Sequence, residues 1–140
     1  MQKYSLLFLS LFVIVSFISC GTSTGKYSDV RSLMEESIAA QEALIKDIDA
    51  ATNANDVAKA INSYADAIEV MQPKIKQLQA KYPELNDANA QMPKELLDLE
   101  QKQAALSQKL TTSMMEKMPK YATDKEVMKA SMRLAKISQM

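Results

Sequence analysis

The chain has 140 residues, with 17 basic and 17 acidic side chains, no histidine and one cysteine. The lack of histidine removes the commonest general base and the commonest metal ligand. Its two glycines do not form a Gly-rich phosphate loop. Balanced charge argues against nucleic acid as a general partner, because nucleic-acid-binding proteins usually carry a strong basic excess. These exclusions predict a protein without enzyme activity, catalytic residues or a bound cofactor.

The first twenty residues have the order of an export signal. Lys3 precedes an apolar run over residues 6–18, and the small residue Ser19 stands just before Cys20, the only cysteine. A bilayer span needs about 20 apolar residues, so this run is short for a stable span. Its length matches the apolar part of a signal peptide. We interpret residues 1–19 as a signal peptide.

The motif Phe17-Ile18-Ser19-Cys20 resembles the lipobox of bacterial lipoproteins, with Phe17 where an aliphatic residue is usual. The resemblance covers about the first 21 residues. It implies that the Cys20 thiol carries lipid, that the chain is cut before Cys20, and that the lipid holds the protein in a bilayer. Gly21, where an Asp would favour the inner membrane, suggests the outer membrane, facing the periplasm. An ordinary cleaved signal and an uncleaved anchor are the alternatives.

A short polar segment follows the cysteine. Cys20 and residues 21–27 form the expected lipidated tether, whose seven residues after the cysteine reach roughly 25 Å when extended. A lipidated Cys20 leaves no thiol for a disulfide, for zinc or for nucleophilic catalysis. The remaining residues, 28–140, are rich in strong helix formers and predict a single all-α domain.

Four amphipathic helices are predicted within this domain, over residues 28–51, 55–82, 93–118 and 123–139. Asn55 is the expected N-cap of the second helix, and residues 123–126 form a capping box for the fourth. Pro73 should kink the second helix, and Pro119 should stop the third. The second helix has a complete apolar heptad seam, formed by Val57, Ile61, Tyr64, Ile68, Met71, Ile75, Leu78 and Tyr82.

The inward sides of the last two helices are less regular. For the third helix we expect Leu96, Leu97, Leu99, Leu106, Leu110, Met114 and Met118 to face inward. For the fourth we expect Val127, Met128, Leu134, Ala135 and Ile137.

Short connections predict that consecutive helices pack as antiparallel neighbours, in an up-and-down bundle of three long helices and a shorter C-terminal one. Charge favours packing the two halves together, because residues 26–72 carry four basic and nine acidic groups whereas residues 73–140 carry twelve and eight. A long open hairpin is the alternative.

Ten methionines are unusual in a chain of this length, and several gather near the predicted turn between the third and fourth helices. Soft thioethers bind Cu(I), so Met114, Met118, Met128 and Met132 form a candidate metal site. The competing interpretation, which we favour, is that these flexible side chains fill gaps in the core.

Two polar patterns carry further hypotheses. Gln41 and Gln103 lie mid-seam in the first and third helices and could form a buried amide pair that fixes register; the alternative is that both face water. A basic stripe on the fourth helix suggests contact with anionic lipid or a partner, or simply a solvated face. Its members are Lys125, Lys129, Arg133 and Lys136.

Together these features predict a non-enzymatic, membrane-anchored envelope lipoprotein that acts by binding or as a structural component. Its expected partners are the lipid bilayer, through acylated Cys20, and an envelope protein. The alternatives are a small-ligand or Cu(I)-binding periplasmic lipoprotein and a helical holdase chaperone with open arms.

Overall fold

The computed structural model describes residues 25–86 and 91–139, and in these ranges the chain is helical or in loops, with no strand. The long helices are α1 (Ser28–Ala50), α2 (Ala54–Lys81) and α3 (Leu97–Tyr121), and the shorter one is α4 (Lys125–Ile137). Two 3-10 helices, η2 (Pro83–Asn86) and η3 (Lys94–Leu96), lie between α2 and α3. The predicted all-α class, with three long helices and a short one, is confirmed. The predicted signal peptide and Cys20 lie outside the described residues.

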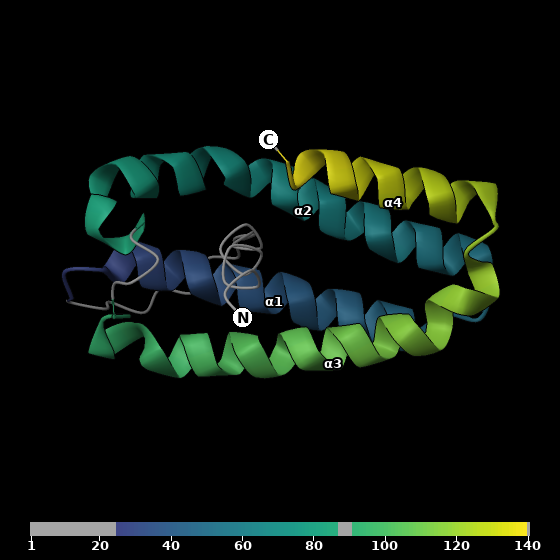
Figure 1. Ribbon diagram of the computed structural model, residues 1–140, viewed down its shortest axis with the longest axis horizontal. Coiled ribbons are helices and arrows are strands. Elements are labelled where there is room, and N and C mark those ends of the chain that lie inside the picture. The colour runs from purple at the N-terminus through teal and green to yellow at the C-terminus, as the bar shows by residue number, and fades with distance from the viewer. Residues whose placement is uncertain (1–24, 87–90, 140) are drawn as a thin grey trace, which may run out of the picture.

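Consecutive helices alternate in direction, as an up-and-down bundle requires (Figure 1). The main contacts join α1 with α2, α1 with α3, and α2 with α4. The short turn after α3 therefore does not make α3 and α4 close neighbours, and that part of the antiparallel-neighbour prediction is wrong. Instead, α3 runs beside α1 in the same direction, and α4 runs beside the first part of α2.

Polar contacts join α1 to α3 along their lengths. Arg31, near the start of α1, forms an ion pair with Asp98, near the start of α3, at 2.8 Å. Further along the same two helices, Glu42 and Lys102 are paired at 2.9 Å. At their ends, Lys117 Nζ donates to the carbonyl oxygen of Asp49 at 3.0 Å. Opposite charges thus join the two halves of the chain, as their composition suggested.

Two groups of buried side chains form the core. The larger group lies between α1, α2 and α4, and the predicted heptad seam of α2 supplies five of its members, from Val57 to Met71. The smaller group joins the first half of α1 to the end of α2 and the start of α3. Its members are Val30, Met34, Ile38, Tyr82, Leu96 and Leu99.

The helix boundaries correct several predictions. The N-cap of α2 is Asn53, whose side chain accepts from the backbone N–H of Asp56, and not Asn55. Asp124 caps α4 by accepting from the N–H groups of residues 126 and 127. Asn, Asp, Ser and Thr side chains can all accept from the free N–H groups of a first helical turn. The residue types alone therefore did not show which of two neighbouring polar residues is the N-cap.

Neither proline ends its helix. α2 continues through Pro73, as expected for a proline on the exposed face. α3 also continues past Pro119 to Tyr121, so the predicted stop at Pro119 is wrong. Pro119 has no backbone N–H and so removes one hydrogen bond from the last turn. Because only two helical residues follow it, the loss of that bond does not end the helix earlier.

Some side chains that we expected to face inward are exposed. Leu97 is 37% exposed and Met128 is 43% exposed. Ala135 is exposed too. These helices have only one main neighbour each, so their buried faces are narrower than a four-sided bundle would give. Among the described helices, none is both long and apolar enough to cross a membrane.

Candidate functional site

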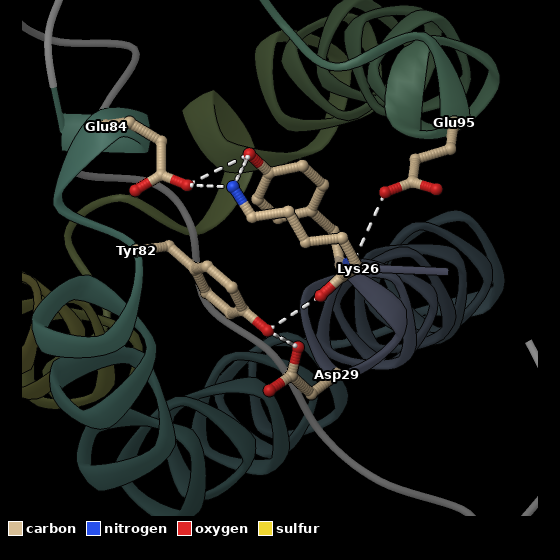
Figure 2. A network of polar contacts seen from close by, with 6 residues as sticks. Lys26, Asp29, Tyr82, Glu84 and Glu95 are labelled. Atoms are coloured by element: carbon tan, nitrogen blue, oxygen red, sulfur yellow. Dashed lines mark hydrogen bonds and ion pairs between the residues drawn. The ribbon is translucent and has the colours of Figure 1, made fainter. Parts of the chain in front are cut away.

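The end of the bundle where the described chain begins is closed by a polar network, which we call the tether-end network: Lys26, Tyr27, Asp29, Tyr82, Glu84 and Glu95 (Figure 2). Lys26 Nζ lies 2.8 Å from Glu84 Oε1. The hydroxyl of Tyr82 lies 2.8 Å from the carbonyl oxygen of Lys26 and 2.9 Å from Asp29 Oδ1. The backbone N–H of Tyr27 donates to Glu95 Oε1 at 3.2 Å. Residues just before α1 are therefore bonded to η2, to η3 and to the end of α2.

The charges in this network perturb one another. The hydrogen bond from Lys26 lowers the pKa of Glu84 to about 2. The same contact raises the pKa of Lys26. The hydrogen bond to Asp29 raises the pKa of Lys81 to about 12. Burial alone would raise the pKa of Asp29, but hydrogen bonds from Lys81 and Tyr82 outweigh it, and the pKa is lowered. All four groups are therefore charged at neutral pH.

Gly25 passes close to the same network. A Cβ atom at Gly25 would lie 2.5 Å from Glu95 Oε2, so any larger residue would displace that carboxylate. Lys26 and Tyr27, which we expected to lie in the tether, thus belong to the folded end of the bundle.

An apolar cavity of about 110 Å³ lies at the same end. Its walls come from α1, from the last turns of α2 and from the segment that follows. Val30, Met34, Ile75, Leu78 and Tyr82 are among the lining residues. The Tyr82 hydroxyl is already engaged by Lys26 and Asp29. Such a cavity suits a small apolar group, because the side chains around it are mainly apolar.

The four candidate copper ligands do not all line one site. Met114 and Met118 both pack against the larger core group. Met118, Met128 and Met132 line one open surface hollow of about 580 Å³ where α3 turns into α4. We call it the methionine hollow. Core filling explains Met114 but not Met128 and Met132, which are 43% and 66% exposed.

The basic stripe of α4 is divided by its contacts. Arg133 turns toward α2 and pairs with Asp66 at 2.7 Å and with Glu69 at 2.9 Å. Lys125 and Lys129 instead border the methionine hollow, and Lys136 is exposed. One predicted member therefore holds α4 to α2, while the three lysines stay on the outer face.

The predicted pairing of Gln41 with Gln103 is wrong. Gln41 is fully buried, and neither its amide nitrogen nor its amide oxygen has a hydrogen-bond partner. Gln103 is half-buried and donates to the hydroxyl of Ser37 at 3.1 Å. Tyr64 is also buried: burial raises the pKa of its hydroxyl, and a weaker side-chain interaction with Gln41 lowers it by a smaller amount. The two groups therefore lie within reach of each other, but their geometry is too poor for a well-formed hydrogen bond.

Acidic side chains do not gather into a metal site in the part of the chain that the structure describes. Known proteins offer no guide to this chain, since no family model, curated protein or solved structure matches it.

Sequence reasoning missed the tether-end network completely. Its members are common polar residues with ordinary spacing, and Lys26 and Glu84 are 58 positions apart. A local signal was present only at residues 82–83, where Tyr-Pro marks the end of a helix and so brings the next residues back toward the start of α1.

Proposed function

We propose that this protein is a lipid-anchored component of the bacterial cell envelope, held in the outer membrane through acylated Cys20. Its helical bundle acts by binding another envelope component and not by catalysis. The observation that carries the proposal is the position of the only cysteine, directly after Ser19 and the apolar run of residues 6–18. Two or three acyl chains on such a cysteine give durable anchoring, whereas a single chain is marginal.

The tether-end network supports this proposal by fixing where the chain leaves the bundle. Lys26 and Tyr27 are bonded to Glu84 and Glu95, so Gly25 is the first residue outside those contacts. From Cys20 to Gly25 an extended chain covers at most about 17 Å. A lipid on Cys20 would therefore hold this end of the bundle close to the bilayer surface.

Binding is favoured over catalysis because the chain lacks histidine and a second cysteine. The exposed apolar side chains at the methionine hollow are a surface of the kind that recognises partners. The holdase alternative called for open arms without a closed core, whereas helices α1, α2 and α4 surround a buried core.

Metabolic labelling with an alkyne fatty acid tests the anchor. The wild-type chain should incorporate the label and sediment with membranes, and Cys20→Ala should abolish incorporation. Ser23→Ala, in the same segment, is the matched control and should label normally. Equal labelling of the Cys20→Ala variant would refute lipidation at this residue.

Cross-linking in native membranes tests the binding role. After mild cross-linking, affinity purification should recover a defined envelope component in stoichiometric amount. Recovery of bulk lipid alone would contradict the binding role and leave only the anchor.

The second candidate function is Cu(I) binding, favoured by the three thioethers that line the methionine hollow. It ranks second because Lys125 and Lys129 border the hollow and oppose a bound cation. Titration with a Cu(I) probe decides between them: micromolar binding that M128L/M132L removes and M34L/M71L preserves would establish it.

A further inference from the structure

The outer face of α4 combines exposed methionines with lysines on one side of the helix. Val127, Ala130 and Ile137 are buried against the rest of the bundle. At about 100° per residue, the opposite side of the helix carries a second set of residues within an arc of roughly 100°. This set, the α4 outer face, consists of Lys125, Met128, Lys129, Met132 and Lys136.

Contacts to α2 keep this face turned outward. Arg133 is bound to Asp66 and Glu69, and Gln72 Nε2 donates to the carbonyl oxygen of Ile137 at 2.6 Å. These contacts hold the middle and the end of α4 on α2. The outer face is thus presented by a docked helix and not by a loose one.

The methionines of the outer face are exposed to water. Met132 is 66% exposed and Met128 is 43% exposed. Together with Met118 and Ala122, the two α4 methionines form the apolar lining of the methionine hollow. Burying such side chains removes apolar area from water, so an apolar occupant is favoured.

The charge of the surrounding residues indicates that the occupant is anionic. Residues 109–139 carry seven basic and three acidic groups, a net charge of +4. Residues 26–72 carry four basic and nine acidic groups, a net charge of −5. Within the hollow, Glu126 is the acidic lining residue, and Lys129 lies 3.6 Å from it. An occupant that is both apolar and anionic fits this surface.

We propose that the α4 outer face rests on an anionic lipid surface, with Met128 and Met132 in the interface and Lys125, Lys129 and Lys136 against the headgroups. Lysine stems are apolar and their ammonium groups reach the headgroups, so lysine and methionine can share one interfacial face. The proposal rests on the anchor of the proposed function, which places a bilayer within reach.

The geometry of the bundle defines how it would lie. α1 spans 23 residues, or roughly 35 Å, between the tether end and the far end. α4 starts at the far end and returns halfway along α2 (Figure 1). Contact through α4 therefore requires the bundle to lie lengthwise on the membrane, which a tether of about 17 Å allows.

Methionine oxidation provides the test, because the exposed methionines are built-in probes. The lipidated full chain, purified from membranes, is mixed with vesicles of phosphatidylcholine alone or with added phosphatidylglycerol. Hydrogen peroxide is then added, and sulfoxide at each methionine is followed by mass spectrometry. Oxidation of Met128 and Met132 should slow several-fold only on phosphatidylglycerol vesicles, while buried Met34 and Met71 stay slow throughout.

A charge variant sharpens the test. K125Q/K129Q/K136Q should remove the protection, because three lysines near an anionic surface strengthen contact on the order of a hundredfold. K46Q/K59Q/K76Q removes the same charge from exposed positions of α1 and α2 and should keep it. Circular dichroism confirms that both variants fold.

The outcomes separate this inference from the anchor. Flotation with phosphatidylcholine vesicles reports the anchor alone. Equal oxidation of Met128 and Met132 on both kinds of vesicle overturns the α4 contact, whether or not the protein floats. Protection without vesicles that grows with protein concentration also overturns it, because a second copy of the chain would then cover the face.

Discussion

The two ends of the bundle differ in which side chains they expose to solvent. At the tether end, charged groups from residues 26–29 and 81–95 pair with one another, and a small apolar group seals the core beneath them. At the far end, the short α4 covers α2 but leaves methionines and lysines outward. A surface whose charges are paired within the chain has few groups left to bind a partner, whereas an exposed mixture of apolar and basic groups has several. We therefore propose a structural role for the tether end and a recognition role for the α4 end.

Core truncation should have the largest effect and should differ between the ends. Ile68→Ala, at a fully buried position of the α2 seam, should lower the free energy of unfolding by about 2–5 kcal/mol. Leu96→Ala removes as many carbons at the tether end and should cost less, because a short 3-10 helix relaxes around a lost side chain more easily than three packed helices do. Urea denaturation measures both.

The control for this comparison is Val70→Ala, at a position 59% exposed, which should change stability by no more than about 0.5 kcal/mol. Equal losses at Ile68 and Leu96 would show that the two core groups are equally rigid.

Gln41→Leu should stabilise the protein. The buried amide of Gln41 makes no well-formed hydrogen bond, so replacing it with an apolar side chain should raise the free energy of unfolding by about 1 kcal/mol. The same change at Gln103 should lower it by about 0.5–1.5 kcal/mol, since it removes the hydrogen bond to Ser37. Thermal unfolding of the two variants measures the contrast, and a destabilised Gln41→Leu variant would mean that Gln41 does have a partner.

Arg133→Gln should loosen α4 by a smaller amount. Both ion pairs of Arg133 are exposed to solvent and screened by it, so their loss should lower the stability of the whole protein only slightly. Amide hydrogen exchange should speed up in α4 and stay unchanged in α3. Lys136→Gln, one turn away on the outer face, should leave exchange in α4 as it was.

The smallest effect should come from acid at the tether end. Glu84 has a lowered pKa, so its contact with Lys26 contributes fully above the ordinary value of 4.5 and is lost as pH falls toward about 2. Carbon-13 NMR of the Glu84 carboxyl should show this titration, and Lys26→Met should move it back toward 4.5. A midpoint near 4.5 in the wild-type chain would mean that the network does not form in solution.

The candidate sites were predictable to different degrees. The sequence indicates Cys20 by its place after an apolar run, although the residues concerned lie outside the described part. The clustering of methionines near one turn was also visible, but the sequence did not show that Met114 is outside the lining of the hollow formed by Met118, Met128 and Met132. Helical spacing predicts which residues share a face of a helix, but it does not predict which face packs against another helix.

Local chemistry was enough to determine four helices, their order and their approximate ends, because capping, propensity and apolar periodicity act within a few residues. The seam of α2, which is buried nearly as its heptads require, shows how far that reasoning reaches. Only the tertiary structure decided that α3 lies on α1 and α4 on α2, and so which polar groups meet. Those contacts join residues 60–71 positions apart, such as Glu42 with Lys102 and Arg133 with Asn62. Their formation depends on how whole helices pack, which no local pattern records.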